Sequence, residues 1–380
     1  MKIAYVSTFD ARLVQSWSGT GYIIAKELER QGVDISYVGP LSEKNGLFYK
    51  AKQLFYREIL KKRHIRQAEP AILHHNALQI SEQISIINPD IILSIWAYPI
   101  AFLECKQPIV FIADATFPLM HDYYNEYTNL STTTINNISK LEKSDMDRSA
   151  AVIYSSNWAA QSAINDYGIS PNKVHVIPFG AIINSVPTKN DVENFIENRV
   201  NSDVCNLLFL GVDWERKGGR IAYNTLLELL KKGMKVQLTV CGCIPPDEFS
   251  HSKMQVIPFL DKSNNNDSEQ FTTLLRESHF LLLPTRKEAY GLVFCEASAF
   301  ALPSITTDTG GVGEIIQNGI NGYTLPFSSD AIEYAELIST LWINKEEYYN
   351  LSQSSYNEFT TRLNWDFASE QIKIILEKLR

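Results

Sequence analysis

Residues 284–314 read PTRKEAYGLVFCEASAFALPSITTDTGGVGE. They follow a short apolar run, Phe280 to Leu283, which predicts a buried strand. A polar loop then carries Glu288, a helix is expected from Gly291 to the next proline, and a second strand is expected over 304–307. This alternation of strand, helix and strand is typical of an α/β protein.

Two carboxylates, Glu288 and Glu296, lie eight positions apart around the expected helix start. The helix N-terminus between them offers backbone N–H groups and a positive dipole end to an anion. Paired carboxylates can be an acid and a base, as in glycoside hydrolysis, or two separate anchors for sugar hydroxyls. An anion site between two such anchors suits a nucleotide sugar. Two unrelated surface glutamates are the plain alternative.

Bulk properties narrow the class of protein. A chain of 380 residues predicts two domains, and its net charge of −8 argues against a general nucleic-acid binder. None of the five cysteines forms a Cys-x-x-Cys pair, which predicts free thiols in a reducing compartment. The longest apolar stretch, residues 91–103, is broken by Pro99 and is too short to cross a bilayer. We therefore expect a cytoplasmic protein that does not bind nucleic acid.

Short apolar runs recur along the chain, separated by helical patterns and polar loops, and they predict parallel sheets. The last helical patterns cover 332–344, 345–363 and 367–379. The expected strands are 2–7, 35–38, 91–95, 109–113, 151–154, 174–178, 206–210, 235–241, 255–260, 280–283 and 304–307.

Glycines mark the loop before the first expected helix, at Gly19 and Gly21. A dinucleotide fingerprint is not completed, because Ala25 replaces the third glycine and no acidic residue follows the second strand.

Further along, Asp114 follows the strand 109–113, where open α/β sheets place their ligands. It either acts on an acceptor hydroxyl or caps the next turn.

A basic pair, Arg216 and Lys217, lies in a glycine-containing turn after the strand 206–210. Lysine as a point charge and arginine as a fork suit a diphosphate. A basic surface turn is the plain alternative.

The segment 47–67 holds seven Lys or Arg residues against the single Glu58, with large apolar residues interleaved. A helix of this kind either lies on an anionic membrane or is a solvated face whose apolar side packs in the core. We favour the second interpretation.

The motif Asp145-Met146-Asp147 falls within a helical pattern, where residues two apart point to different sides. We therefore expect a solvated helix face there and no metal site.

The arrangement around the two glutamates resembles a known signature. Glu288 and Glu296 enclose Tyr290-Gly291-Leu292, and PSITTDTGG (303–311) and NGINGYTLP (318–326) follow. This order closely resembles the donor site of retaining glycosyltransferases with the GT-B fold, the family called glycosyl transferases group 1 (family 4). Ser-x-x-Trp at 155–158 and Ile-Pro-x-Gly at 177–180 also resemble that family.

The resemblance implies an α/β GT-B fold, with two Rossmann-like domains facing across a cleft and a C-terminal helix crossing back to the first. The expected domains are 1–185 on the acceptor side, 186–363 on the donor side, and the helix 364–380.

The resemblance also implies roles for residues. Glu296 would hold the ribose and Glu288 the transferred sugar, while Lys217 would bind the diphosphate. Two positions depart from the family: Val212 stands where an arginine is frequent, and Asp114 where many relatives have histidine. Arg216 is the candidate substitute for that arginine. The remaining donor-binding candidates are Gly19 and Gly21 near the phosphate and acceptor, Phe259 and Leu260 near the base, and the N–H groups of Tyr290, Gly291 and Leu292.

The activity that the resemblance implies is transfer of a sugar, with retention, from a UDP- or GDP-sugar to an acceptor hydroxyl without a metal. Asp114, Glu288 and Lys217 are the catalytic candidates. The acceptor, an unidentified sugar, lipid-linked or small molecule, points to polysaccharide or glycoconjugate biosynthesis, and a peripheral inner-membrane contact through 47–67 stays open. A GT-B sugar-nucleotide epimerase and a non-catalytic GT-B scaffold are the alternatives.

Overall fold

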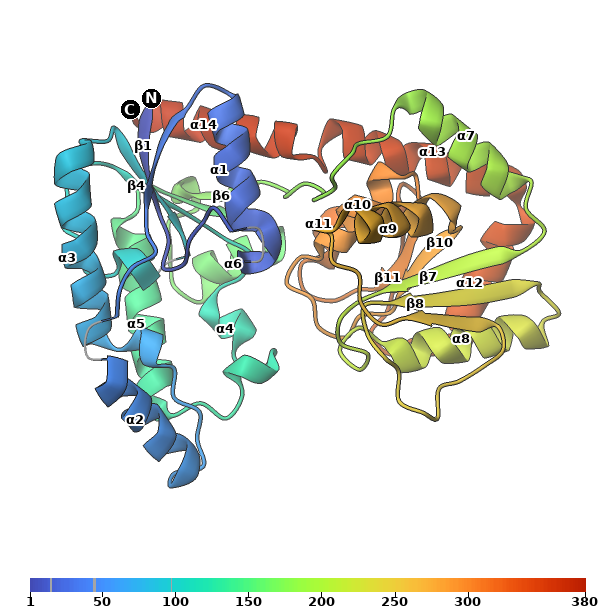
Figure 1. Cartoon of the computed structure of the whole chain (residues 1–380), viewed down its shortest axis with the longest axis horizontal. Helices are drawn as coiled ribbons and strands as arrows, with labels where there is room; N and C mark the ends of the chain where they lie inside the picture. Colours follow the sequence, from blue (N-terminus) through green and yellow to red (C-terminus); the bar gives the residue numbers. More distant parts are fainter. Residues whose placement is uncertain (14–15, 44–45, 97) are drawn as a thin grey trace. The chain divides into compact units, whose positions relative to one another are not determined.

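The computed structural model describes residues 1–13, 16–43, 46–96 and 98–380. The chain divides into two compact units (Figure 1). Unit 1 contains Met1–Pro178 together with Trp365–Arg380, and unit 2 contains Phe179–Asn364. Each unit holds a six-stranded sheet in which every pair of neighbouring strands is parallel, as expected from the alternation of strands and helices.

The sheet of unit 1 has the order β2-β1-β3-β4-β5-β6. Every residue of β3 and β4 is buried, as is usual for central parallel strands covered on both faces. The strands are β1 (Lys2–Val6), β2 (Asp34–Val38), β3 (Ile91–Ile95), β4 (Ile109–Ala113), β5 (Ala151–Tyr154) and β6 (Val174–Val176). The α-helices are α1 (Thr20–Arg30), α2 (Gly46–Glu58), α3 (Pro70–Ile87), α4 (Phe117–Met120), α5 (Thr132–Arg148), α6 (Asn157–Asn165) and α14 (Trp365–Leu379).

The sheet of unit 2 has the order β12-β11-β10-β7-β8-β9. From β7 the chain adds β8 and β9 on one side and then β10, β11 and β12 on the other, so the strand order reverses between β7 and β10. Open α/β sheets bind ligands at such a position, at the carboxyl ends of their strands. The strands are β7 (Cys205–Leu210), β8 (Val236–Cys241), β9 (Met254–Ile257), β10 (Phe280–Leu283), β11 (Ser304–Thr307) and β12 (Gly322–Leu325). The α-helices are α7 (Lys189–Val200), α8 (Gly219–Lys231), α9 (Asn265–Glu277), α10 (Leu292–Ala299), α11 (Val312–Ile315), α12 (Ala331–Ile343) and α13 (Lys345–Thr361).

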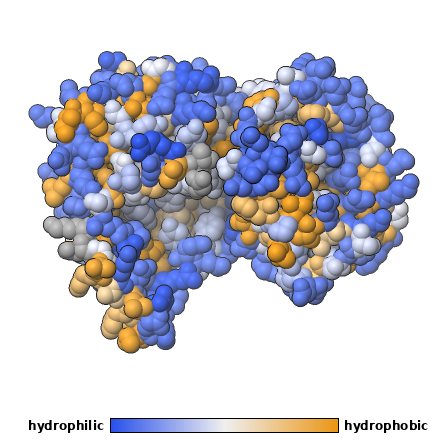
Figure 2. Space-filling model, viewed as in Figure 1, coloured by the Kyte–Doolittle hydropathy of each residue, from blue (hydrophilic) through white to orange (hydrophobic). Residues whose placement is uncertain are grey.

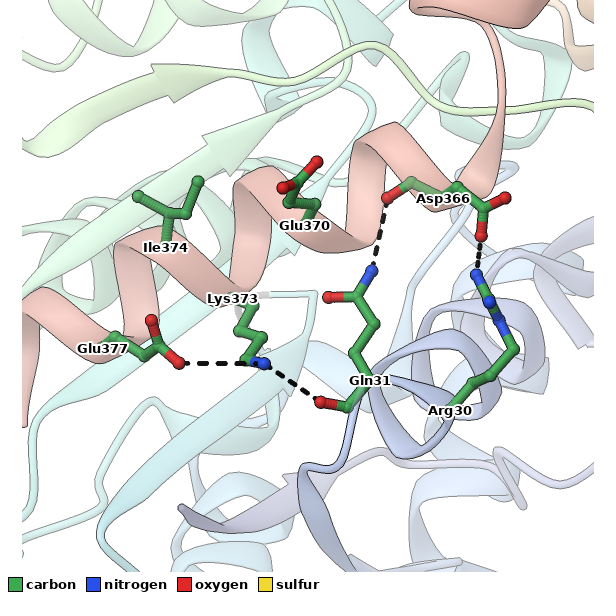
Figure 3. Close-up of a pocket in the computed structure, with 7 residues that line it drawn as sticks. All are labelled: Arg30, Gln31, Asp366, Glu370, Lys373, Ile374 and Glu377. Atoms are coloured by element: carbon green, nitrogen blue, oxygen red, sulfur yellow. Dashed lines mark hydrogen bonds and ion pairs between the residues drawn. The ribbon is translucent and has the colours of Figure 1, made fainter.

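The last helix, α14, returns the chain to unit 1 and packs against α1 (Figure 1). Gln31 lies at the end of α1, and its side-chain amide donates to the Ser369 hydroxyl at 2.5 Å. In return, Lys373 Nζ donates to the Gln31 carbonyl at 3.0 Å (Figure 3). Trp365 at the start of α14 is buried, so it anchors the helix in the core of unit 1. A hollow of about 460 Å³ remains along this contact.

The expectation of one helix over 47–67 is wrong in its second half, because α2 ends at Glu58. Arg63 instead pairs with Leu130 as a parallel bridge. Its N–H donates to the Asn129 carbonyl at 2.9 Å, and its carbonyl accepts from the Ser131 N–H at 2.8 Å. These backbone bonds to a distant segment replace the bonds that a longer helix would need.

The two aspartates in α5 point to different sides, as expected, but the expectation that both are solvated is wrong. Asp145 is fully buried and lies 3.3 Å from Arg148 Nη2, whereas Asp147 is exposed and pairs with Lys143 at 3.0 Å. Burial raises the pKa of Asp145 well above its ordinary value.

Within the described residues, no helix has the length and apolar content needed to cross a bilayer.

Candidate functional site

The loops that follow β7 and β10 are held together at the point where the strand order of unit 2 reverses. The Arg286 N–H donates to the Arg216 carbonyl at 2.8 Å. Gly218 has φ 77°, and a Cβ there would lie 1.9 Å from the Pro284 carbonyl oxygen. The left-handed conformation and the close approach both require glycine. The loop carrying the basic pair is therefore fixed against the loop carrying Glu288.

Lys217 and Glu288 form a buried ion pair between these loops. Lys217 Nζ donates to Glu288 Oε2, and both side chains are about nine-tenths buried. Arg216 Nη1 lies 3.9 Å from the same oxygen and donates to the Lys287 carbonyl at 3.0 Å. The structure thus brings the adjacent Arg216 and Lys217 of one loop together with Glu288 of a second loop, which is 71 positions from Lys217.

Helix α10 begins at this ion pair. Gly291 is its N-cap with φ 97°, and it has no side chain to cap the first N–H groups. A Cβ there would lie 2.7 Å from the Phe294 ring, so a larger residue is not accommodated. The Tyr290 hydroxyl donates to the Phe179 carbonyl at 2.9 Å inside unit 2. The Tyr290 side chain is therefore structural, and only its backbone contributes to the helix start, together with Gly291 and Leu292.

Glu296 lies in the second turn of α10 and is buried. Lys262, from the loop between β9 and α9, donates to Glu296 Oε1 at 2.6 Å. Burial raises the pKa of Glu296, and the Lys262 ammonium and the Ile182 N–H lower it in part. Lys262 Nζ also lies 4.1 Å from the centre of the Phe271 ring. Lys262 was not predicted from the sequence, because nothing in its own loop indicates that it reaches a residue 34 positions away.

The other candidates in unit 2 lie in nearby loops. Phe259 and Leu260 precede Lys262 in the same loop, with Phe259 64% exposed and Leu260 partly buried. Val212, at the position of the frequent family arginine, is 68% exposed. Arg216 is held by the Asp213 carboxylate, which accepts its backbone N–H at 2.9 Å.

The remaining candidates lie in unit 1. Asp114 directly follows β4, and its carboxylate accepts the indole N–H of Trp17 at 3.3 Å. Trp17 in turn packs edge-on against Trp96, with ring centres 5.7 Å apart. Gly19 is the N-cap of α1 with φ 85°, and the carbonyl of Gly21 accepts the Tyr5 hydroxyl at 2.7 Å. A Cβ on Gly21 would lie 2.9 Å from Ile95 Cδ1 of β3, so glycine there allows α1 to begin close to the sheet. Trp17 was not predicted from the sequence.

Two family models match the chain. The model described as Glycosyltransferase Family 4 matches residues 22–183, and the model described as Glycosyl transferases group 1 matches residues 205–344. The first ends within the loop that follows β6, and the second spans the loops that carry Lys217, Glu288 and Lys262.

Curated relatives match parts of the chain. An uncharacterized 41.2 kDa protein from the cps region of Klebsiella pneumoniae is 25% identical over 55% of this chain and 56% of its own length. The N-acetyl-alpha-D-glucosaminyl L-malate synthase of Bacillus anthracis is 34% identical over 27% of this chain and 26% of its own length. The chain thus matches about half or less of the length of these relatives.

Solved structures match over the whole chain. A glycosyltransferase from Rickettsia africae has a TM-score of 0.68 at 19% identity and is covered over 98% of its length, with 100% of this chain. An Anabaena protein solved in complex with UDP and glucose has a TM-score of 0.64 at 16% identity, with both chains fully covered. At such identities these structures show a common fold. Since the two family models also match in succession along both units, the chain belongs to the GT-B glycosyltransferases of the glycosyl transferases group 1 and family 4 type.

Proposed function

We propose that this protein is a retaining glycosyltransferase that transfers a sugar from a UDP- or GDP-sugar to an acceptor hydroxyl. The observation that carries this proposal is the cluster of Lys217, Arg216 and Glu288 beside the start of α10, with Glu296 in the next turn. It combines positive charge, a helix N-terminus and two buried carboxylates. UDP is the favoured nucleotide because a similar structure was solved with UDP and glucose.

The leaving diphosphate needs positive charge as its bond to the sugar breaks. Lys217 and Arg216 supply two cations, and the N–H groups at Gly291 and Leu292 supply the positive end of a helix. These groups do the work that a metal ion performs in other transferases, so the proposed reaction requires no metal.

The Lys217 ammonium donates to the Glu288 carboxylate in the structure. We propose that the diphosphate draws Lys217 away and that Glu288 then accepts hydroxyl groups of the transferred sugar. Glu296 would accept the ribose hydroxyls, since a carboxylate has enough lone pairs for two of them beside Lys262. The exposed ring of Phe259 is the proposed neighbour of the base, next to Leu260.

The acceptor is proposed to bind on unit 1, which would make residues 1–185 the acceptor side and 186–363 the donor side. Its hydroxyl attacks the sugar from the side that the phosphate leaves, so the anomeric configuration is retained. The departing phosphate takes the proton of the hydroxyl. Asp114 positions that hydroxyl or accepts its hydrogen bond, and the Trp17 indole orients the carboxylate. Gly19 and Gly21 are proposed to let the phosphate and the acceptor approach the backbone, because they have no side chains.

The proposed acceptor is a hydroxyl group of a sugar, a lipid-linked molecule or a small molecule. We propose that the reaction takes place in the cytoplasm, with a peripheral membrane contact through residues 47–67.

The test is a thermal-shift series with UDP, GDP, ADP and their common sugar conjugates, without added metal, on the wild type and Glu296→Ala. Binding to the native state raises the midpoint by mass action. We expect a shift with one base that the variant loses. A matched control is Glu277→Ala, an exposed glutamate of the same unit. The absence of a shift with every nucleotide would instead support a scaffold protein.

Incubation of the wild type with the stabilising nucleotide sugar separates the two enzymatic alternatives. Transfer to an added acceptor with the anomeric configuration kept supports the proposal. Conversion of the donor into its epimer without an acceptor would contradict the transferase proposal and support a sugar-nucleotide epimerase.

A further inference from the structure

The helix α2 presents an apolar face to solvent. None of its residues is buried, and Leu47, Phe48 and Phe55 are 84%, 65% and 52% exposed. Figure 2 shows apolar side chains gathered at the end of unit 1 where Figure 1 draws α2. The expectation that this face packs in the core is therefore wrong.

The periodicity of α2 explains how one face is attached and the other is left open. Tyr49, Lys52 and Tyr56 are spaced by three and four residues, share one side of the helix, and are less exposed than their neighbours. Tyr56 stacks on His64 with ring centres 4.5 Å apart, and Lys52 pairs with Glu69 at 2.6 Å. The opposite side carries the apolar residues Leu47, Phe48, Ala51, Leu54 and Phe55.

Positive charge borders this face. Residues 47–67 carry seven Lys or Arg residues against one Glu in a chain whose net charge is −8. Lys50, Lys61 and Lys62 are exposed, and the structure records no ion pair for them in the described part of the chain. Beside the helix, a hollow of about 500 Å³ is lined by Lys50, Arg57 and Arg63 and by the acidic Glu126. Arg57 also pairs with Glu58 at 2.7 Å, and both of these side chains are exposed.

We propose that α2 docks this protein on an anionic lipid bilayer, with its apolar face in the headgroup region and lipid phosphates in the hollow lined by Lys50, Arg57 and Arg63. This inference deepens the proposed function, because it names the surface at which the acceptor is met. An apolar helix face bordered by Lys and Arg is the combination that binds an anionic interface. A second copy of the chain fits less well, because two such segments would bring like charges together.

The test is co-sedimentation with vesicles of phosphatidylcholine alone and of phosphatidylcholine mixed with phosphatidylglycerol. We expect binding to the anionic vesicles, little binding to the neutral ones, and loss of binding as salt screens the charges. The salt dependence is measured on the wild type, so it does not depend on the folding of any variant. Equal binding to both vesicles, or binding to neither, would overturn the proposal.

Two variants separate charge from apolar contact. Lys50→Gln/Lys61→Gln/Lys62→Gln should bind anionic vesicles at least about tenfold more weakly. Its control is Lys26→Gln/Lys106→Gln/Lys140→Gln, which removes the same charge from exposed positions elsewhere in unit 1. Leu47→Ser/Phe48→Ser/Phe55→Ser should also lose binding, whereas Leu78→Ser/Ile86→Ser on the exposed face of α3 should not. Equal losses in the variants and their controls would contradict a role for α2.

The stabilisation by nucleotide distinguishes this proposal from the donor-site proposal. Variants of α2 should lose vesicle binding and keep the thermal shift with the nucleotide, whereas Glu296→Ala should do the opposite. A concentration-dependent dimer that Leu47→Ser/Phe48→Ser/Phe55→Ser abolishes, without vesicle binding, would assign the face to a second copy.

Discussion

Lys262 and Glu296 form an ion pair with a nitrogen-to-oxygen distance of 2.6 Å, and they come from the loop between β9 and α9 and from helix α10 of unit 2. The Glu296 side chain is 6% exposed and that of Lys262 is 40% exposed. Burial alone favours the protonated carboxyl, whereas the Lys262 ammonium favours the carboxylate that the proposed contact with the ribose hydroxyls requires. Lys217 adds a weaker effect in the same direction.

Lys262→Met is expected to make nucleotide binding more sensitive to acid. Removal of the ammonium raises the pKa of Glu296 further, so the carboxylate is lost at a higher pH when the pH falls. The ratio of the variant and wild-type Kd values for UDP should therefore grow from alkaline to acidic pH. Isothermal titration calorimetry over a series of pH values measures both Kd values. Their ratio is independent of the protonation of UDP, which affects both proteins equally. Lys231→Met, at an exposed position of α8, is the control, and a ratio independent of pH would contradict this role.

Glu288→Gln is expected to separate turnover from nucleotide binding. The proposed role of Glu288 is to hold the transferred sugar, so its loss should lower kcat about 10²-fold or more. UDP has no sugar at that position, and its affinity should stay the same or rise because Lys217 is released from the ion pair. Steady-state kinetics with the nucleotide sugar and calorimetry with UDP give the two values. Glu269→Gln, at an exposed glutamate of α9, should change neither. A large loss of UDP affinity would place Glu288 at the nucleotide.

Gly218→Ala and Gly233→Ala form a matched pair. Both glycines have left-handed backbones, with φ 77° and 79°, but a Cβ meets the Pro284 carbonyl oxygen only at Gly218. Each variant should lose about 1–2 kcal/mol of unfolding free energy through backbone strain. Gly218→Ala should lose about 1–3 kcal/mol more, because the new methyl group pushes the two loops apart. Urea unfolding measures the difference. Nucleotide binding should also weaken in Gly218→Ala alone, and equal effects of the two changes would be inconsistent with a fixed loop pair.

Glu142 in unit 1 should make stability depend on pH. It is buried, its carboxylate accepts from the Phe117 N–H at 2.8 Å and the Tyr167 hydroxyl at 2.5 Å, and burial raises its pKa from 4.5 to about 7. A carboxyl whose pKa is raised in the folded state stabilises it below pH 4.5, and this contribution is lost as the pH rises toward 7. The free energy of unfolding of the wild type should fall by about 3 kcal/mol across that window relative to Glu142→Gln. Urea unfolding at a series of pH values measures this difference, and parallel curves for the two proteins would disprove it.

The strands were predictable because central parallel strands are buried on both faces and leave continuous apolar runs in the sequence. The run 280–283 is β10 to the residue, and 304–307 is β11. The strand β12 (Gly322–Leu325) was not predicted, because two of its four residues are only partly buried and it lies at the edge of the sheet. Its residues entered the prediction only as part of the stretch 318–326 that resembles the family signature.

The donor-site candidates were identified through a local signature, and local signatures do not report distant partners. Glu288 and Glu296 were found in this way, but their lysine partners come from loops 71 and 34 positions away. The end of α2 was missed for a related reason. The composition of 47–67 is that of a continuous helix, and the backbone bonds of Arg63 to Asn129 and Ser131 override it.

The return of α14 to unit 1 has a consequence for how the protein is made. Unit 2 is one continuous stretch, residues 179–364, whereas unit 1 needs residues from both ends of the chain. Because a ribosome delivers the chain from its N-terminus, the residues of unit 2 are all synthesised before Trp365–Arg380. The unit that comes second in the sequence is therefore the first whose residues are all available for folding, and α1 meets its partner helix α14 only after all of unit 2 has been synthesised.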